Sequence, residues 1–160
     1  MQNAIHIFFR FLLLLLIAAA PVLIATSCSS EDDLNAIFNG KTWYITGARI
    51  NGQELTGDQL KSLYTNADAY RILFTSSTFS GALAPGSTIN GTWSADGKDK
   101  TFQMNFSTAN YVEAATVSNL IYNILRYATT YSGDENVLKI QQDSDNFVRL
   151  SIQRTTASTY

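Results

Sequence analysis

The residue with the most distinctive chemistry in this sequence is Cys28, the only cysteine in the 160-residue chain. A thiol is a strong nucleophile that can be modified covalently, and a signal peptidase cuts where the side chains before the cleavage site are small. Residues 25–27 (ATS) meet that requirement directly ahead of Cys28, and residues 11–20 (FLLLLLIAAA) form an unbroken apolar run before them. We therefore expect residues 1–27 to be a signal peptide and Cys28 to begin the mature protein.

This segment resembles a lipoprotein signal peptide, with Cys28 at the position of the lipidated cysteine and Ala25 where that family usually has leucine. A plain secretory signal and a transmembrane anchor are the alternatives. Residues 5–25 hold about enough apolar side chains to span a bilayer, although Arg10 and Pro21 interrupt them. Because each buried acyl CH₂ contributes about 0.8 kcal/mol, a lipidated Cys28 with two or more chains would hold the protein in its membrane.

A polar segment that ends in three consecutive acids follows the cysteine: Ser29, Ser30, Glu31, Asp32 and Asp33. Carboxylates at this place repel anionic headgroups and keep a tether extended and solvated. The pattern resembles the acidic export signal of Bacteroidetes lipoproteins, which implies a lipid-anchored location on the outer face of the outer membrane. An ordinary flexible linker is the alternative. We assign residues 28–40 to an acidic tether.

Length and charge limit what the rest of the chain can be. Removing residues 1–27 leaves 133 residues, which suffice for one domain with a core but not for two ordinary ones. The mature chain keeps all thirteen acids and ten of the eleven bases, for a net charge of −3. This mild acidity predicts no nucleic-acid partner.

Missing residue types exclude most catalytic chemistry. The lone histidine, His6, lies in the signal peptide, so the mature chain has no imidazole for a catalytic triad or a histidine-rich zinc site. One cysteine cannot form an internal disulfide. Clustered oxygens in residues 143–146 (DSDN) are like a calcium loop but lack its glutamate, which favours a hairpin turn. We expect no enzyme, no cofactor and no metal site.

Alternating apolar side chains and turn signals predict seven short strands. The pattern is clearest where Phe102, Met104 and Phe106 alternate with polar residues, and Gly91 leaves a gap on its strand that a neighbouring aromatic side chain could fill. Asn51 and Gly52 mark a tight turn. The expected strands are 42–46, 70–74, 78–81, 88–94, 101–106, 136–141 and 147–153.

Two helices are expected. Thr56 and Gln59 have capping-box spacing ahead of a short helix over residues 57–64. A longer helix is predicted by a continuous apolar face, with Asn110 and Glu113 marking its start and Gly133 lying beyond its end. That face consists of Val117, Leu120, Ile121, Ile124, Leu125 and Ala128. Its polar side has no lysine cluster, so packing against the sheet is favoured over binding a membrane surface.

These elements predict an α+β fold, an antiparallel β meander of about seven strands with barrel-like curvature and one long packed helix. It forms a single β-rich domain over residues 41–154, and residues 155–160 are a polar tail.

The order of these segments resembles the META/HslJ-like domain of bacterial envelope lipoproteins. The similar segments are TWYITGARINGQEL, YRILFTSSTFSG, INGTWSADGKDKTFQM, SNLIYNILRYATTYSGDENVLKI and FVRLSIQR, which together extend over residues 42–154. The cysteine-containing signatures of that family have no counterpart here. This resemblance implies an envelope domain of unknown function.

Two shorter motifs, GKTW at residues 40–43 and GTWSADGKDKTFQM, are similar to those of lipocalin-like Bacteroidetes lipoproteins. Barrels of that family often enclose a small apolar ligand. Aromatic side chains that would line such a cavity, or fill an ordinary core instead, are Trp43, Tyr70, Phe74, Trp93 and Phe102.

Three functions therefore remain open. The leading expectation is a non-enzymatic envelope module for binding or structural interaction, with a glycan, a protein or another envelope component as partner. The alternative is a lipocalin-like carrier of a small apolar ligand. The third, a carboxylate enzyme, is disfavoured because no activated nucleophile is in view.

Overall fold

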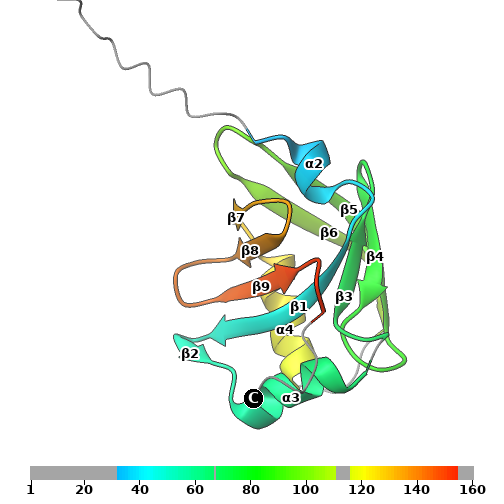
Figure 1. The fold of residues 1–160 in the computed structure, drawn as a ribbon, viewed down its shortest axis with the longest axis vertical. Helices are drawn as coiled ribbons and strands as arrows, with labels where there is room; N and C mark the ends of the chain where they lie inside the picture. The colour runs from blue at the N-terminus through cyan, green and yellow to red at the C-terminus, as the bar shows by residue number, and fades with distance from the viewer. Residues whose placement is uncertain (1–31, 67, 111–115, 155–160) are drawn as a thin grey trace, which may run out of the picture.

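The computed structural model describes residues 32–66, 68–110 and 116–154, which form a curled antiparallel sheet with three helices (Figure 1). This confirms the expected α+β class and its barrel-like curvature. The elements in chain order are α2 (Leu34–Phe38), β1 (Thr42–Ile50), β2 (Gln53–Glu54), α3 (Gly57–Thr65), β3 (Arg71–Phe74), β4 (Thr78–Ala82), β5 (Thr88–Ala95), β6 (Phe102–Asn110), α4 (Val117–Arg126), β7 (Thr130–Gly133), β8 (Val137–Gln141) and β9 (Phe147–Ser151).

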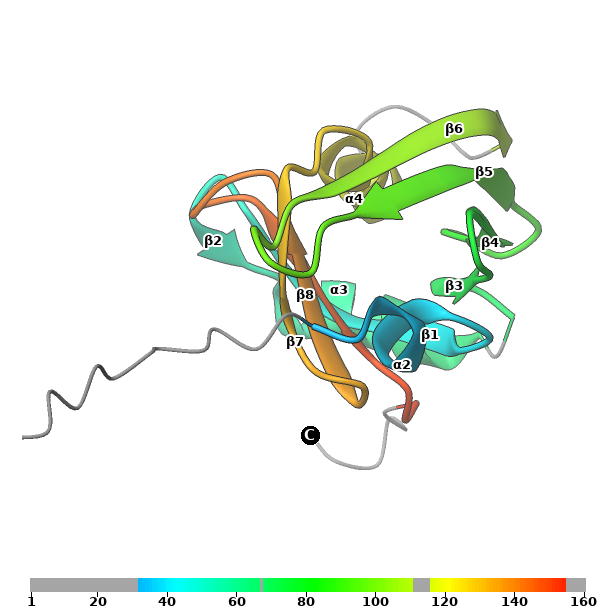
Figure 2. The same cartoon turned by 90° about the horizontal axis from the view of Figure 1, so that it is seen from above.

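The strand order in the sheet is β6-β5-β4-β3-β1-β9-β8-β7, with the short β2 paired to β1. Strands β3 to β6 and β7 to β9 each run as a meander, and β1 joins the two groups because it pairs with both β3 and β9. Figure 2 shows from above how these strands curve around a shared interior. The last strand therefore lies beside the first long one.

The two edges of the sheet meet at one end of the opening. Thr101 and Thr130 form a bridge there, the amide of Phe102 donates to the Thr129 carbonyl at 2.9 Å, and that of Tyr131 donates to the Lys100 carbonyl at 3.0 Å. Beyond this bridge, α4 packs between β6 on one side and β8 and β9 on the other. The helix thus covers the part of the opening that the strands leave.

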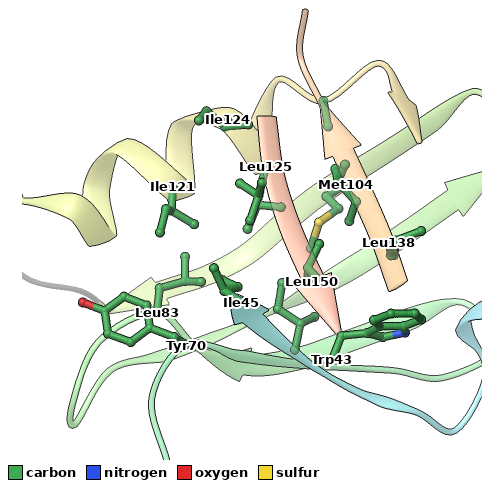
Figure 3. Close-up of a cluster of buried hydrophobic side chains, with 14 of the residues drawn as sticks. Trp43, Ile45, Tyr70, Leu83, Met104, Ile121, Ile124, Leu125, Leu138 and Leu150 are labelled. Carbon is green, nitrogen blue, oxygen red and sulfur yellow. The ribbon is translucent and has the colours of Figure 1, made fainter. Parts of the chain in front are cut away.

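The long helix presents its apolar face to the interior, as its sequence pattern predicts. Ile121 and Leu125 are fully buried and point from α4 toward Ile45 and Leu150 of the sheet (Figure 3). The hydroxyl of Thr116 accepts from the backbone amide of Asn119 and caps the helix. None of the helices in the described part of the chain is long and apolar enough to cross a bilayer.

Local details confirm several predictions from sequence. The capping box of α3 is present, with the Thr56 amide donating to the Gln59 side chain at 2.8 Å. Asn51 and Gly52 form the expected turn with φ values of 50° and 77°. A Cβ at Gly91 would lie 2.9 Å from the Phe79 ring and clash with the Asn105 carbonyl oxygen. Gly91 is therefore required for the close approach of β4, β5 and β6.

The structure differs from the sequence-based boundaries in three places. Strand β6 continues to Asn110, which pairs with Thr88, so the long helix begins after Thr116 rather than near Asn110. Gly133 belongs to β7 and does not follow the helix directly. Strands β2 and β7 were not expected, because two to four residues with few β-branched side chains give little periodic signal.

Candidate functional site

The five aromatic side chains proposed as a cavity lining are all in the buried core: Trp43, Tyr70, Phe74, Trp93 and Phe102. The structure brings three of them together, because the rings of Phe74, Trp93 and Phe102 lie with centroids 5.4 to 6.2 Å apart. Tyr70 contacts α4 instead, with its hydroxyl 3.0 Å from Ser118 Oγ. The indole N–H of Trp93 donates to the Thr75 carbonyl at 2.9 Å.

Phe38 of α2 occupies the middle of this group. Its ring centroid lies 4.7 Å from that of Trp93, 5.4 Å from those of Phe74 and Tyr131, and 5.5 Å from that of Phe102. We call these five rings the aromatic cluster. A ligand in this space would have to displace Phe38, which is completely buried. That these residues line a ligand cavity stays a prediction.

Helix α2 forms because a cap and an apolar face coincide. The Asp33 carboxylate accepts from the amides of Asn35 and Ala36 at 3.0 and 3.1 Å, which satisfies two free donors of the first turn. Ile37 and Phe38 are buried, and Leu34 packs against the same core. Sequence reasoning missed this helix, although the cap and the i, i+3, i+4 spacing were visible.

Asp32 fastens α2 to the opposite edge of the sheet. Its carboxylate forms an ion pair with Lys100 and accepts from the Tyr131 hydroxyl at 2.8 Å, and its amide donates to the Gly97 carbonyl at 3.2 Å. We call Asp32, Lys100 and Tyr131 the latch. The hydrogen bond from Lys100 lowers the pKa of Asp32, whereas burial and then the Asp32 hydrogen bond raise the pKa of Tyr131.

The predicted lipidation and export residues fall into two groups, because the described residues begin at Asp32. Cys28, Ser29, Ser30 and Glu31 lie outside the described residues. Asp32 and Asp33, which the sequence analysis placed in the tether, belong to the folded domain as latch and helix cap. The domain thus begins at least nine residues before the expected boundary at residue 41.

The acidic loop at residues 143–146 is the turn of the β8–β9 hairpin. Asp143 accepts from the Asp145 amide at 2.8 Å and from the Asn146 side chain at 3.0 Å, and the Asn146 contact lowers the pKa of Asp143. These are the hydrogen bonds of a side-chain-stabilised turn. Within the described residues, no three histidine, cysteine, aspartate or glutamate side chains group as metal ligands would.

The described residues line open hollows on the outer face of the sheet, two of which contain an arginine. The larger one, of about 470 Å³, lies over β3 and β4, and Arg71 at its wall forms an ion pair with Asp68 at 3.5 Å. The second, of about 290 Å³, lies over β7, β8 and β9. Arg149 at its rim binds Glu54 through two contacts of 2.6 and 2.8 Å, which also lower the pKa of Glu54. Both arginines therefore already have carboxylate partners.

A third hollow, of about 270 Å³, lies between β6 and the end of α4. The Arg126 guanidinium lies over the rings of Tyr122 and Tyr127, at 6.0 and 5.6 Å from their centroids. The Tyr122 ring packs edge-on against Phe106 at 4.7 Å, whereas Tyr127 is 56% exposed. We call this the Tyr–Arg hollow. The sequence alone does not single out Tyr122 and Tyr127, because their pairing with Arg126 and β6 depends on the fold.

The described residues form a small β-rich domain. Its interior is filled by buried side chains, including the Phe38 ring, and its outer face has open hollows. The sequence model of DUF4847, described as a domain of unknown function, matches residues 29–152, and the chain therefore belongs to that family. The match includes the α2 region, in agreement with its place in the folded domain.

Two solved structures share this fold. A crystal structure of a DUF4847 family protein from Bacteroides vulgatus is 23% identical with a TM-score of 0.59, and the similarity covers 76% of this chain and 98% of that one. An NMR structure of a protein from Burkholderia xenovorans is 12% identical with a TM-score of 0.50, covering 71% and 82%. No curated protein matches the chain. The resemblance to META/HslJ-like and lipocalin-like domains stays a prediction.

Proposed function

We propose that this protein is a lipid-anchored module of the bacterial outer membrane that faces the cell surface and binds a partner without catalysis. The lipid would be carried by Cys28, and the acidic residues behind it would direct export. Family membership and a structural neighbour from Bacteroides are compatible with that origin.

The observation that carries this proposal is the position of Asp32. Its latch contacts place it in the folded domain only four residues after Cys28. Four residues span at most about 14 Å. A lipid on Cys28 would therefore keep the end of the domain that carries α2 close to the membrane surface.

The state of the carboxylates supports a binding role over a catalytic one. A general acid at neutral pH needs a raised pKa, but in the described residues each resolved carboxyl shift is a lowering. Hydrogen bonds to Lys100 and Arg149 lower the pKa of Asp32 and Glu54, and backbone amides lower those of Asp96 and Asp134. Asp32 and Glu54 thus act as ion-pair partners, and Asp96 and Asp134 stabilise turns.

The anchor is tested by Cys28→Ser, with Ser30→Ala as the matched control in the same segment. We expect the full chain to fractionate with outer membranes, C28S to be released or left unprocessed, and S30A to behave as wild type. Globomycin, which blocks lipoprotein processing, should reproduce the C28S result. If C28S remains in the membrane fraction with unchanged processing, the lipid anchor is wrong.

Surface exposure is tested separately by adding protease to intact cells. We expect the domain to be cleaved there, and to remain protected when Glu31, Asp32 and Asp33 are replaced together by Asn. Protection of the wild-type domain in intact cells, with cleavage only after lysis, would place it on the periplasmic side instead.

A further inference from the structure

The Tyr–Arg hollow differs from the other two hollows in the state of its arginine. Arg71 and Arg149 are paired with Asp68 and Glu54, whereas Arg126 forms no ion pair with any described residue. We propose that this hollow binds a carboxylate-bearing ring of monosaccharide size, such as a uronic acid unit of an acidic glycan. The inference rests on the proposed role as a binding module and names its ligand class.

The carboxylate follows from the way Arg126 is held. Its guanidinium carbon lies over the rings of Tyr122 and Tyr127, 6.0 and 5.6 Å from their centroids. A cation–π contact of this kind uses no conventional hydrogen bond, so the five N–H donors of the guanidinium remain available to other groups. A planar carboxylate matches that fork with two parallel hydrogen bonds. The two tyrosines therefore orient a donor that has no acceptor within the described part of the protein.

The free edge of β6 supplies further hydrogen-bonding groups. The Phe102 amide donates away from β5, to Thr129, and the Asn105 carbonyl oxygen lies against Gly91 of β5. Because backbone groups alternate in direction along a strand, those of Met104 and Phe106 point away from β5, toward α4 and the hollow. Both residues line it. Ring hydroxyls can pair with such edge groups.

The ring shape follows from Tyr127 and from the size of the hollow. Tyr127 is the C-cap residue of α4, and its ring is one of three large apolar side chains found exposed in the described residues. An exposed aromatic face is suited to a flat, partly apolar ring. The volume, about 270 Å³, lies below the range of about 300–1,000 Å³ of sites for drug-sized ligands. One ring therefore fits better than an extended chain.

The proposal is tested with the full chain in detergent micelles, titrated with sodium glucuronate, glucose and benzoate and followed by calorimetry or NMR. We expect saturable binding of glucuronate. Glucose should bind at least about tenfold more weakly, since it lacks the charged group that pairs with Arg126. Benzoate, which has a ring and a carboxylate but no hydroxyls, should also bind more weakly.

Arg126→Gln should weaken glucuronate binding by about tenfold or more, Arg126→Lys by less because the charge remains, and Tyr127→Ala severalfold. Arg71→Gln is the control and should leave binding unchanged. Circular dichroism checks that each variant is folded. Absence of saturable glucuronate binding, or equal binding of glucuronate by R126Q, would overturn the proposal. Equal affinity for benzoate and glucuronate would overturn the assignment of the ligand as a sugar. Because no membrane is involved, these outcomes are independent of the Cys28 experiment.

Discussion

Helices α2 and α4 both cover the interior of the curled sheet, but they are held by different means. Helix α4 has ten residues and a continuous apolar face, with Ile121 and Leu125 fully buried. Helix α2 has five residues, too few to be stable without tertiary contacts. It is fixed by the Phe38 ring inside the aromatic cluster and by the latch. Helix α4 thus depends on its own continuous apolar face, whereas α2 depends on contacts with residues far away in sequence.

The two helices should therefore fail in different ways when they are damaged. Damage to α4 removes part of the common core, so the whole domain should unfold. Damage to α2 should first release the N-terminal segment and uncover the aromatic cluster while the sheet remains. Local stability of this kind varies through a structure with the number of buried contacts.

The largest effect is expected from Leu125→Asp in α4. Loss of a buried leucine together with burial of a charge should lower the free energy of unfolding by at least about 4 kcal/mol, most of the stability of an ordinary domain. Urea denaturation measures it. Asn123→Asp, on the exposed side of the same helix, is the control and should change little. A folded L125D protein would break the assignment of α4 to the core.

Phe38→Ala tests the attachment of α2 in the same way. The loss of the ring should lower the stability of the segment by about 3 kcal/mol, seen as faster hydrogen exchange in α2 and a change in Trp93 fluorescence. Amides of β1 and β9 should stay protected. Asn35→Ala, an exposed change in the same helix, is the control. Equal loss of protection in β1 would mean that α2 and the sheet unfold as one unit.

Asp32→Asn tests the latch and should lower stability by about 1 kcal/mol at neutral pH, since the partners are partly exposed. The pKa of Asp32 is lowered in the folded state by Lys100, so its contribution is present above the unfolded pKa and is lost as the pH falls through the folded value. The pKa of Tyr131 is raised, so its contribution is lost above about pH 10.

The difference between wild type and D32N should therefore be constant from about pH 5 to pH 9 and should disappear on further acidification. Thermal unfolding across this range measures it, with Lys98→Gln as a control on a lysine that has no ion pair in the described residues. If the stability difference between wild type and D32N is undiminished at pH 2, the negative charge of Asp32 does not stabilise the latch.

The smallest effect is expected at the caps. Asp33→Ala should destabilise α2, and Thr116→Ala should destabilise α4, each by about 0.5–1 kcal/mol. Asp33→Asn keeps the accepting oxygen and should behave nearly as wild type. Hydrogen exchange should register D33A in α2 and T116A in the whole core. Faster exchange throughout the core in D33A, or only in α4 in T116A, would contradict the distinction between the two helices.

Sequence patterns predict the parts of this fold that repeat a period over several turns or residues. The face of α4 and the alternation in β6 are of this kind, and both are found in the structure. The turn at Asn51 and Gly52 is also found, and it is predicted by residue type. Strand β7 is too short for a period, and α2 shows only one i, i+3, i+4 set of apolar residues. They are fixed by distant contacts such as the Thr101–Thr130 bridge and Phe38 among its neighbours.

The candidate site was less accessible from sequence for a related reason. Aromatic residues such as Trp43 and Phe74 are identifiable in the chain, but their distribution between core and surface depends on which face each strand buries. Tyr122, Arg126 and Tyr127 are neighbours on one helix, yet the hollow exists only because β6 passes beside them. Of the three arginines that line the hollows, Arg71 and Arg149 pair with carboxylates and Arg126 does not, and this difference is likewise a property of the folded chain.

The position of β1 between β3 and β9 has a consequence for how the protein is made. Ile45 pairs with Leu150, and the Thr46 hydroxyl contacts the Arg149 carbonyl across 103 positions of sequence. Pairing over such separations is slow, because the entropy of closing a long loop is lost before the stabilising contacts form. The ladder between β1 and β9 therefore cannot form until Phe147–Ser151 has left the ribosome, so the complete sheet closes only at the end of synthesis.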